Sequence, residues 1–160
     1  MDKEKIYQIA IDTRNFEIQL FWQRSNYFLV LNTAIAVGLF SVKEPVYAVI
    51  LGTFGVVTSF LWFRVNLGSK YWQSRWEHRA STVEKQLGTN VDLFSAIKPV
   101  LDQDVRLSLL NNKDSDQLSL YDYGVMRKPS VSKAMAMLSI SFIGLWSCLL
   151  GLSLGEWLWP

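Results

Sequence analysis

Three long apolar segments constrain this chain more than any other feature, and they cover residues 25–42, 46–63 and 134–155. The third runs for 22 residues without an Asp, Glu, Lys, Arg or His. A helix rises about 1.5 Å per residue, so roughly 20 apolar residues cross a hydrocarbon core about 30 Å thick. A chain of 160 residues has too little polar surface to cover three helices that are apolar all round. We therefore predict three transmembrane helices rather than three core helices of a soluble domain.

The connection between the first two segments is only Lys43-Glu44-Pro45. A link this short permits only an antiparallel hairpin. Pro45 suits the first turn of the second helix, where its missing N–H has no helical partner in any case. The preceding residues 1–24 carry both charges and no small-residue cleavage pattern follows them, which argues against a signal peptide.

The Lys and Arg residues predict the orientation of these helices. Four lie in residues 1–24, one in the hairpin turn, eleven in residues 64–133 and none after the third segment. Basic loops stay in the cytoplasm, so we expect a multi-pass protein of the cell inner (plasma) membrane with a cytoplasmic N-terminus. Each Lys or Arg just before the third segment contributes about 1 kcal/mol of attraction to an anionic lipid leaflet. These predicted membrane-surface anchors are Arg127, Lys128 and Lys133.

Helical periodicity extends from the apolar segments into the charged ones. Residues 1–24 form a predicted amphipathic helix that leads into the first span. After the second span, apolar residues recur at three- and four-residue steps, which predicts a coiled-coil seam that continues into the cytosol and ends at Gly88. The seam is predicted to contain Trp72, Trp76, Ala80 or Arg79, Val83 and Leu87.

Between the seam and the third span we expect two short amphipathic helices, over residues 92–101 and 104–111, each opened by an Asp and separated near residues 99–103. Residues 111–128 are predicted as a loop. The fold class is thus an all-α integral membrane protein, with three transmembrane helices and a small helical cytosolic region. Its segments are a cytosolic helix (1–24), a transmembrane hairpin (25–63), a cytosolic helical region (64–133), the third transmembrane helix (134–155) and an outer tail (156–160).

The sequence offers little catalytic chemistry. His78 and Cys148 are the only residues of their types, so a zinc site lacks partners, and we predict no catalytic residue, metal, cofactor or enzyme activity. No span carries a charged residue between its ends, which disfavours a proton relay. The net charge of +2 comes from interleaved acids and bases, so direct nucleic-acid binding is not expected. Asn32, inside the first span, is expected to bond neighbouring helices, with a wet path in an oligomer as the alternative.

Small residues favour assembly into a homo-oligomer within the lipid bilayer. Ser147, Gly151 and Gly155 repeat every four residues, which allows close approach of helices in lipid. The alternative is packing of the three helices inside one subunit. Trp72 and Trp76 are assigned to the same oligomer or packing face. A second candidate face, for an anionic ligand, a nucleotide or a cytosolic protein partner, comprises Arg75, Arg79 and Lys85.

The stretch Tyr71-Trp72-Gln73-Ser74-Arg75-Trp76-Glu77, continuing to Glu84-Lys85 after two closely spaced spans, resembles the SLATT group of bacterial membrane effectors. The resemblance covers roughly residues 1–88, and the third span departs from the two-span layout of that group. It implies a role beside nucleotide-signalling or antiphage defence genes, in which oligomers breach the inner membrane.

Two functions follow as hypotheses. The first is an oligomeric inner-membrane effector that permeabilises the membrane when its cytosolic helices are triggered. The second is a non-conducting anchor or regulatory subunit for a soluble partner enzyme.

Overall fold

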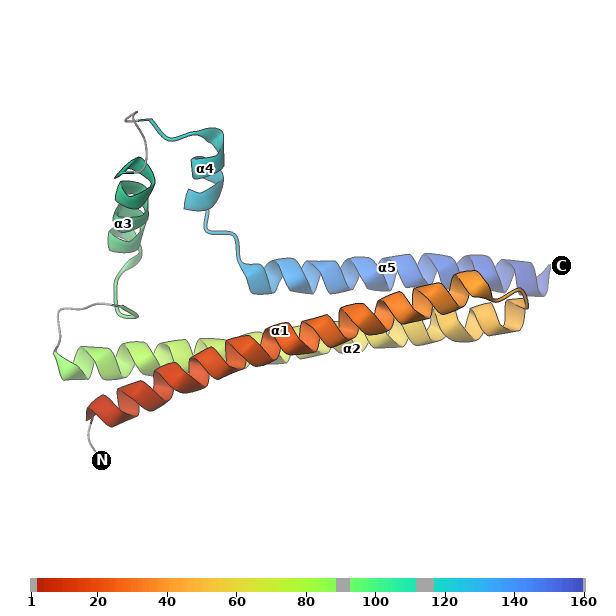
Figure 1. The fold of residues 1–160 in the computed structure, drawn as a ribbon, viewed down its shortest axis with the longest axis horizontal. Coiled ribbons are helices and arrows are strands. Elements are labelled where there is room, and N and C mark those ends of the chain that lie inside the picture. The colour runs from red at the N-terminus through yellow and green to blue at the C-terminus, as the bar shows by residue number, and fades with distance from the viewer. Residues whose placement is uncertain (1–2, 89–92, 112–116, 160) are drawn as a thin grey trace. The chain divides into compact units, whose positions relative to one another are not determined.

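A computed structural model describes residues 3–88, 93–111 and 117–159. In these residues the chain forms five helices and no strand (Figure 1). The predicted all-helical class is therefore confirmed. In chain order the helices are α1 (Lys3–Ser41), α2 (Pro45–Leu87), α3 (Lys98–Asn111), α4 (Leu120–Met126) and α5 (Val131–Leu158).

The two longest helices join the predicted amphipathic and apolar segments without a break. α1 spans 39 residues and α2 spans 43. Pro45 is the first residue of α2, as its lack of an N–H predicts. At the other end of α2, Gly88 has a φ of 66°, which is the left-handed conformation expected of a glycine that ends a helix.

Two local predictions between α2 and α5 are wrong. Residues 98–111 form one helix instead of two, because Pro99 falls in the first turn of α3, where a missing N–H breaks no helical hydrogen bond. The predicted first residue of the earlier of these two helices, residue 92, lies outside the described residues. Part of the predicted loop is the helix α4, which begins with a capping box: Ser119 Oγ accepts from the Asp122 N–H, and the Asp122 carboxylate accepts from the Ser119 N–H.

The chain divides into two compact units. The first unit contains Met1–Arg14 and Ser74–Val131, and the second contains Asn15–Gln73 and Ser132–Pro160. α1 and α2 each contribute residues to both units.

In the second unit, α2 packs antiparallel to both α1 and α5. Along α1 and α2, Arg24 meets Ser69 and Asn32 meets Ser59, so the partner numbers fall as those on α1 rise. Along α5, Gly52 faces Leu150 and Asn66 bonds Ser139, with the same reversal. The short connection and its antiparallel hairpin are thus as expected.

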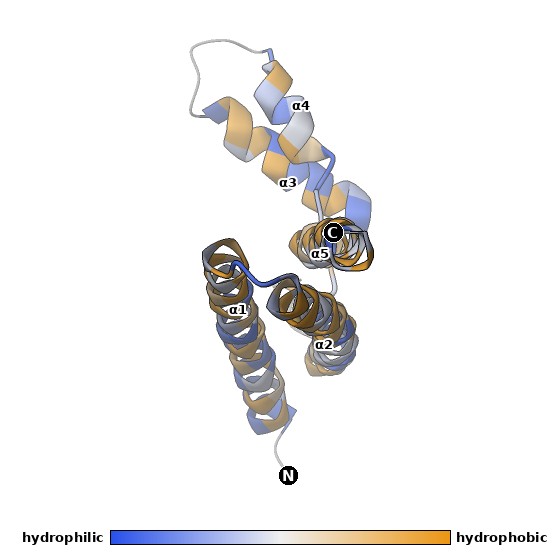
Figure 2. Ribbon diagram, turned by 90° about the vertical axis from the view of Figure 1, so that its right-hand side faces the viewer, coloured by the Kyte–Doolittle hydropathy of each residue, from blue (hydrophilic) through white to orange (hydrophobic). Residues whose placement is uncertain are grey.

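The apolar side chains of α2 and α5 point mostly outward. Both helices are long and apolar enough to cross a membrane, yet only 28% and 11% of their most apolar stretches are buried. The core helix of a soluble protein would be mostly buried. Figure 2 shows the hydrophobic colour distributed around α5, and large side chains such as Ile140, Leu145 and Leu152 are exposed. These surfaces are suited to lipid.

Unlike α2 and α5, α1 is not selected by length and hydropathy as a candidate membrane span. Its second half carries no charged residue after Arg24 and contains five polar residues (Ser25, Asn26, Asn32, Thr33 and Ser41). Two membrane-length apolar helices are therefore present, and the third of the three predicted spans is not confirmed. Two of the five polar residues, Ser25 and Asn32, are buried.

The buried stripe of α2 is displaced from the seam predicted from apolar spacing. Of the predicted seam, Ala80 is buried, Trp72 is 41% exposed, and the others are only partly buried (Trp76, Val83 and Leu87). The stripe still follows three-, four- and seven-residue steps, but most of its members are polar. It consists of Trp62, Asn66, Ser69, Gln73, Ala80 and Glu84.

Candidate functional site

A buried polar cluster joins three helices of the second unit around Asn32. The Asn32 side-chain oxygen accepts a hydrogen bond from the Ser59 hydroxyl at 3.0 Å and from the Trp146 indole N–H at 2.7 Å. Its amide nitrogen donates to the Phe28 carbonyl at 2.8 Å. Asn32, Ser59 and Trp146 are each at most 1% exposed. Asn32 is therefore occupied in bonding helices within one subunit, which favours the first of its two predicted roles.

A second buried layer lies along the same helices. The Asn66 amide donates to the Met135 carbonyl at 3.2 Å and to the Ser139 hydroxyl at 3.4 Å. Trp62 is fully buried and stacks on Phe28 with a centroid distance of 6.2 Å. Together with the Asn32 cluster, this layer gives α1, α2 and α5 a fixed register, because a shift along any helix would separate buried donors from their acceptors.

Glycines in the spans fall into two groups. A Cβ at Gly55 would overlap the Trp146 ring, and one at Gly52 would lie 3.3 Å from Leu150, so these two glycines permit close packing inside the subunit. In contrast, a Cβ at Gly151 or Gly155 would meet nothing within 4 Å. With Ser147, these two residues form an exposed stripe on α5 that the packing of one subunit does not use.

In the first unit, the buried carboxylate of Glu84 holds three chain segments together, and we call this arrangement the Glu84 clamp. Its oxygens accept hydrogen bonds from the backbone N–H groups of Leu93, Phe94 and Ser95 at 2.9, 2.8 and 2.7 Å. They also accept from the Tyr7 hydroxyl at 2.9 Å. The clamp thus joins the start of α1, the end of α2 and the segment 93–95.

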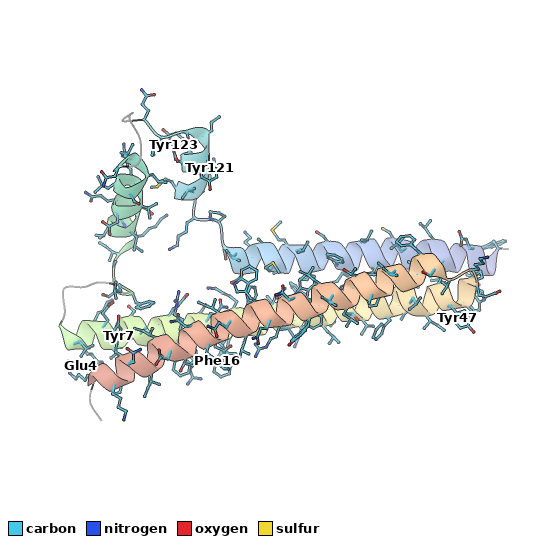
Figure 3. The ribbon with its side chains drawn as sticks, in the orientation of Figure 1. Glu4, Tyr7, Phe16, Tyr47, Tyr121 and Tyr123 are labelled. Carbon is cyan, nitrogen blue, oxygen red and sulfur yellow. The ribbon has the colours of Figure 1, made fainter. Side chains whose placement is uncertain are left out.

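Aromatic contacts surround the Glu84 clamp. Phe94 packs edge-on against Tyr7, with ring centroids 6.4 Å apart, and the Arg14 guanidinium lies 5.2 Å from the centre of the Phe94 ring. Figure 3 shows Tyr7 near the N-terminal end of α1. Arg14 also approaches Glu77 at 3.7 Å. These contacts shield the hydrogen bonds of the clamp from water, which strengthens them.

The hydrogen bonds control the charge of Glu84. Burial raises the pKa of this carboxyl, but the accepted hydrogen bonds outweigh burial and lower the pKa from 4.5 to about 2. Burial and the adjacent carboxylate raise the pKa of the Tyr7 hydroxyl above its usual 10.0. Four donors saturate the carboxylate, so the clamp is a structural element and not an acid–base group. No cluster of three or more His, Cys, Asp or Glu side chains occurs within the residues that the structure covers.

The predicted ligand or partner face is only partly assembled. Arg75, Arg79 and Lys85 are all exposed on α2. Helical geometry places Arg75 and Arg79 about 40° apart, whereas Lys85 lies about 120° from Arg79. The Arg75 guanidinium lies 5.7 Å from the centre of the Trp76 ring. This face and the oligomer role of Trp72 and Trp76 stay predictions.

The predicted membrane-surface anchors belong to different units. Arg127 and Lys128 follow α4 in the first unit, and Lys133 lies on α5 in the second. Lys128 adopts a positive φ of 49° directly before Pro129, and its N–H donates to the Val125 carbonyl at 2.9 Å. All three cations are exposed.

Sequence reasoning missed the Glu84 clamp and the partners of Arg24. The predicted seam of apolar residues does not include Glu84, but Glu84 continues the stripe of Gln73 and Ala80 by a four-residue step. The Arg24 guanidinium contacts Ser69 at 3.2 Å, one stripe position after Asn66. A search for polar residues at helical spacing would have found the stripe, although not the segment that closes on Glu84.

The exposed apolar spans and the buried polar layers define an all-helical membrane protein. A family model for the octameric membrane protein family (8xMP) matches residues 4–155. The chain belongs to this family, and it is accordingly an oligomeric membrane protein. No curated protein and no solved structure gives a significant match. The expected assembly and membrane association are thus supported, while the resemblance to the SLATT group stays an expectation.

Proposed function

We propose that the chain is a three-span subunit of a homo-oligomer in the bacterial inner membrane, which permeabilises that membrane when its cytosolic unit is triggered. The observation that carries the proposal is the continuity of α1 and α2. Each helix contains residues of the Glu84 clamp at one end and residues of the apolar segments at the other. A ligand or partner that disturbs the clamp therefore acts on the same helices that enter the membrane.

α1 serves as the third span in this proposal. Hydropathy alone does not select α1, yet its residues 25–41 carry no charge, and Asn32 bonds α2 and α5 and does not face lipid. A buried and bonded Asn removes most of the penalty for a polar group in hydrocarbon. Three crossings place the N-terminus inside and residue 160, which lies outside the described residues, on the outer side.

Cysteine labelling in intact cells tests this topology. Single cysteines at Ser41 and Trp159 should react with a membrane-impermeant maleimide applied from outside, whereas a cysteine at Gln117 should react only after lysis. Cys148 is first replaced by Ala, because it is an exposed native thiol. A Trp159 cysteine that reacts only after lysis would refute three spans.

The exposed small-residue stripe of α5 supplies a contact surface for neighbouring subunits in the proposed assembly. Ser147, Gly151 and Gly155 lie on one face, and among the described residues nothing lies within 4 Å of a Cβ built at either glycine. Lipid brings no hydrophobic force between helices, so close backbone approach along such a stripe is a principal source of attraction.

Dye release from liposomes tests permeabilisation. Purified wild-type protein should release a small dye when its cytosolic unit is triggered, and the Trp72→Ala, Trp76→Ala double variant should not. As a surrogate for the trigger we would use Glu84→Gln, because this substitution replaces one acceptor oxygen of the clamp with a donor. Two results together would refute the effector function. The inserted, oligomeric wild-type protein would release no dye from liposomes, and it would not permeabilise cells that also express its neighbouring genes.

A non-conducting anchor or regulatory subunit is the second candidate, and one observation favours it. The buried polar side chains Asn32, Ser59 and Ser139 bond other groups within their own subunit, and so does the amide nitrogen of Asn66, whose buried oxygen has no partner. Most of these polar atoms are therefore not available to line a water-filled path. Under this alternative, the exposed cytosolic residues Arg75 and Arg79 would hold a soluble partner, and their replacement by Ala would release it from membranes.

A further inference from the structure

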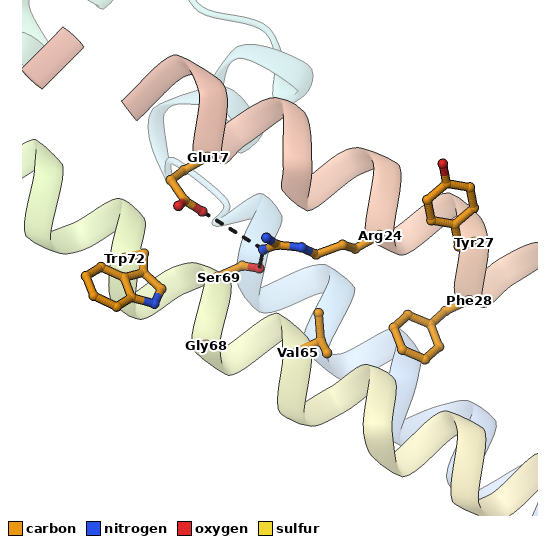
Figure 4. A pocket seen from close by; sticks show the side chains of 8 residues that line it. All are labelled: Glu17, Arg24, Tyr27, Phe28, Val65, Gly68, Ser69 and Trp72. Atoms are coloured by element: carbon orange, nitrogen blue, oxygen red, sulfur yellow. Dashed lines mark hydrogen bonds and ion pairs between the residues drawn. The ribbon is translucent and has the colours of Figure 1, made fainter. Parts of the chain in front are cut away.

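We infer that the groove between α1 and α2 at the inner membrane surface binds one aminophospholipid, through its zwitterionic phosphoethanolamine headgroup. The groove encloses a cavity of about 520 Å³ within the second unit (Figure 4). Arg24 and Glu17 supply its charges. The remaining lining residues are Tyr27, Phe28, Val65, Gly68, Ser69 and Trp72.

The position of the groove suits a lipid headgroup. Arg24 is the last charged residue of α1 before the uncharged stretch 25–42, and charges resume on α2 at Arg64. Val65, Gly68 and Ser69 follow directly on α2. The groove thus straddles the change from charged to apolar sequence on both helices, which is where headgroups lie in a bilayer.

The charges of the groove match a zwitterion better than an anion. The Arg24 guanidinium and the Glu17 carboxylate stand 3.9 Å apart, which is an ion pair but too long for a hydrogen bond. The Glu17 Oε2 atom is buried and has no hydrogen-bond partner, and the Glu17 side chain as a whole is 18% exposed. Arg24 is 40% exposed and offers its remaining N–H donors to a phosphate. An ammonium group can bond Glu17 at the same time, whereas a purely anionic headgroup would be repelled by it.

Apolar and aromatic residues complete the groove. Phe28 and Val65 offer surface to the upper part of an acyl chain, and Trp72 is an amphipathic ring of the type that prefers the membrane interface. Gly68 leaves the floor open, because a Cβ there would meet nothing within 4 Å. Arg24 is also steadied by its 3.2 Å contact with Ser69, which is 2% exposed.

Native mass spectrometry of the full-length oligomer tests the inference. The protein is reconstituted in vesicles with equal amounts of phosphatidylethanolamine, phosphatidylcholine and phosphatidylglycerol of identical acyl chains, and then extracted. Phosphatidylethanolamine should be retained about tenfold over the other two, because only its headgroup combines a phosphate with hydrogen-bonding ammonium protons. Equal retention of the three lipids, or preference for phosphatidylglycerol, would overturn the inference.

Single substitutions distinguish the contribution of Glu17 to lipid binding from that of Arg24. Glu17→Gln should remove the preference for phosphatidylethanolamine over phosphatidylcholine but leave lipid retention, whereas Arg24→Gln should lower retention of both. Gly68→Leu fills the open floor and should displace lipid while the oligomer keeps its mass. The matched control is Glu77→Gln, which breaks an ion pair of 3.7 Å with Arg14 outside the groove. A Glu77→Gln variant that loses lipid as Glu17→Gln does would overturn the assignment.

The source of the headgroup is tested with soluble phosphoethanolamine. We expect millimolar phosphoethanolamine to leave the bound lipid in place, since the acyl chains contribute to binding through Phe28 and Val65. Full displacement would show that the groove takes a soluble ligand and would overturn the lipid assignment. A groove covered by a neighbouring subunit would retain no lipid in the intact oligomer, and that result would likewise overturn it.

Discussion

Replacement of Glu84 by Gln should selectively open the segment 93–95. The lowering of the Glu84 pKa from 4.5 to about 2 corresponds to about 3 kcal/mol at about 1.36 kcal/mol per unit. Gln keeps the size of the side chain but loses the charge and replaces one acceptor oxygen with a donor. That NH₂ group would oppose a backbone N–H that now donates to the carboxylate. We therefore expect a loss of at most about 3 kcal/mol in the local opening free energy.

Hydrogen exchange of the full-length protein in nanodiscs measures this loss. The amides of Leu93, Phe94 and Ser95 should exchange faster in Glu84→Gln, by up to about a hundredfold. Glu77→Gln is the control, because its ion pair with Arg14 is 42% exposed on the Glu77 side and should contribute below about 1 kcal/mol. Exchange at these three amides that stays within about twofold of wild type would refute the reasoning.

The same exchange experiment at different pH values tests the direction of the Glu84 pKa shift. A folded-state pKa below the unfolded value stabilises the clamp above pH 4.5, and the stabilisation is lost as pH falls from 4.5 toward 2. Corrected for the intrinsic exchange rate, protection in wild type should decline across this window. Glu84→Gln should show no such decline, and a wild-type protein without it would contradict the low pKa.

Three further predictions concern the spans. Asn32→Leu should lower the stability of the subunit in detergent by about 1 to 2 kcal/mol, because the Trp146 N–H loses its acceptor, whereas Thr33→Leu should have little effect. Gly55→Ala should also destabilise the subunit, since the added Cβ overlaps the Trp146 ring, and an unchanged unfolding midpoint in SDS titration would contradict the packing. Gly151→Leu should lower the oligomer mass in native mass spectrometry but leave the unfolding of the subunit unchanged, because its Cβ meets nothing within 4 Å.

The sequence predicted the long elements well because their signals are local. Apolar composition located the membrane-length parts of α2 and α5, Pro45 marked the start of α2, and Gly88 marked its end. Each of these signals reflects a backbone or solvent preference that one stretch of chain carries by itself. The continuity of the amphipathic segment with the first apolar segment in α1 was equally predictable.

The buried side of α2 was harder to predict because polar residues occupy it. In water, apolar residues mark the interior, so Trp72 and Trp76 were assigned to the seam. In this chain the buried stripe is largely polar, and Asn66 and Ser69 lie on it while Trp72 is exposed. Lipid accepts apolar side chains at no cost, so the residues that need protein partners are the polar ones.

The candidate site was missed for a different reason. The Glu84 clamp depends on a segment that follows α2 and returns to it, and no periodicity reports such a return. The groove of Arg24 and Glu17 depends on the register of two antiparallel helices, which is set by contacts such as Asn32 with Ser59. Composition and spacing along one helix carry no information on either arrangement.

The Asn32 cluster has a consequence for how the protein is made. Its acceptor oxygen lies on α1, one donor lies on α2, which leaves the ribosome later, and the other donor, Trp146, lies on α5, which follows both. In the three-span arrangement, α1 by itself would carry an unbonded amide in hydrocarbon. Entry of α1 together with α2 as a pair avoids most of this cost, because Ser59 then reaches Asn32 during insertion. The arrival of α5 then completes the bond, so the emergence of the chain from the ribosome sets the sequence of membrane assembly.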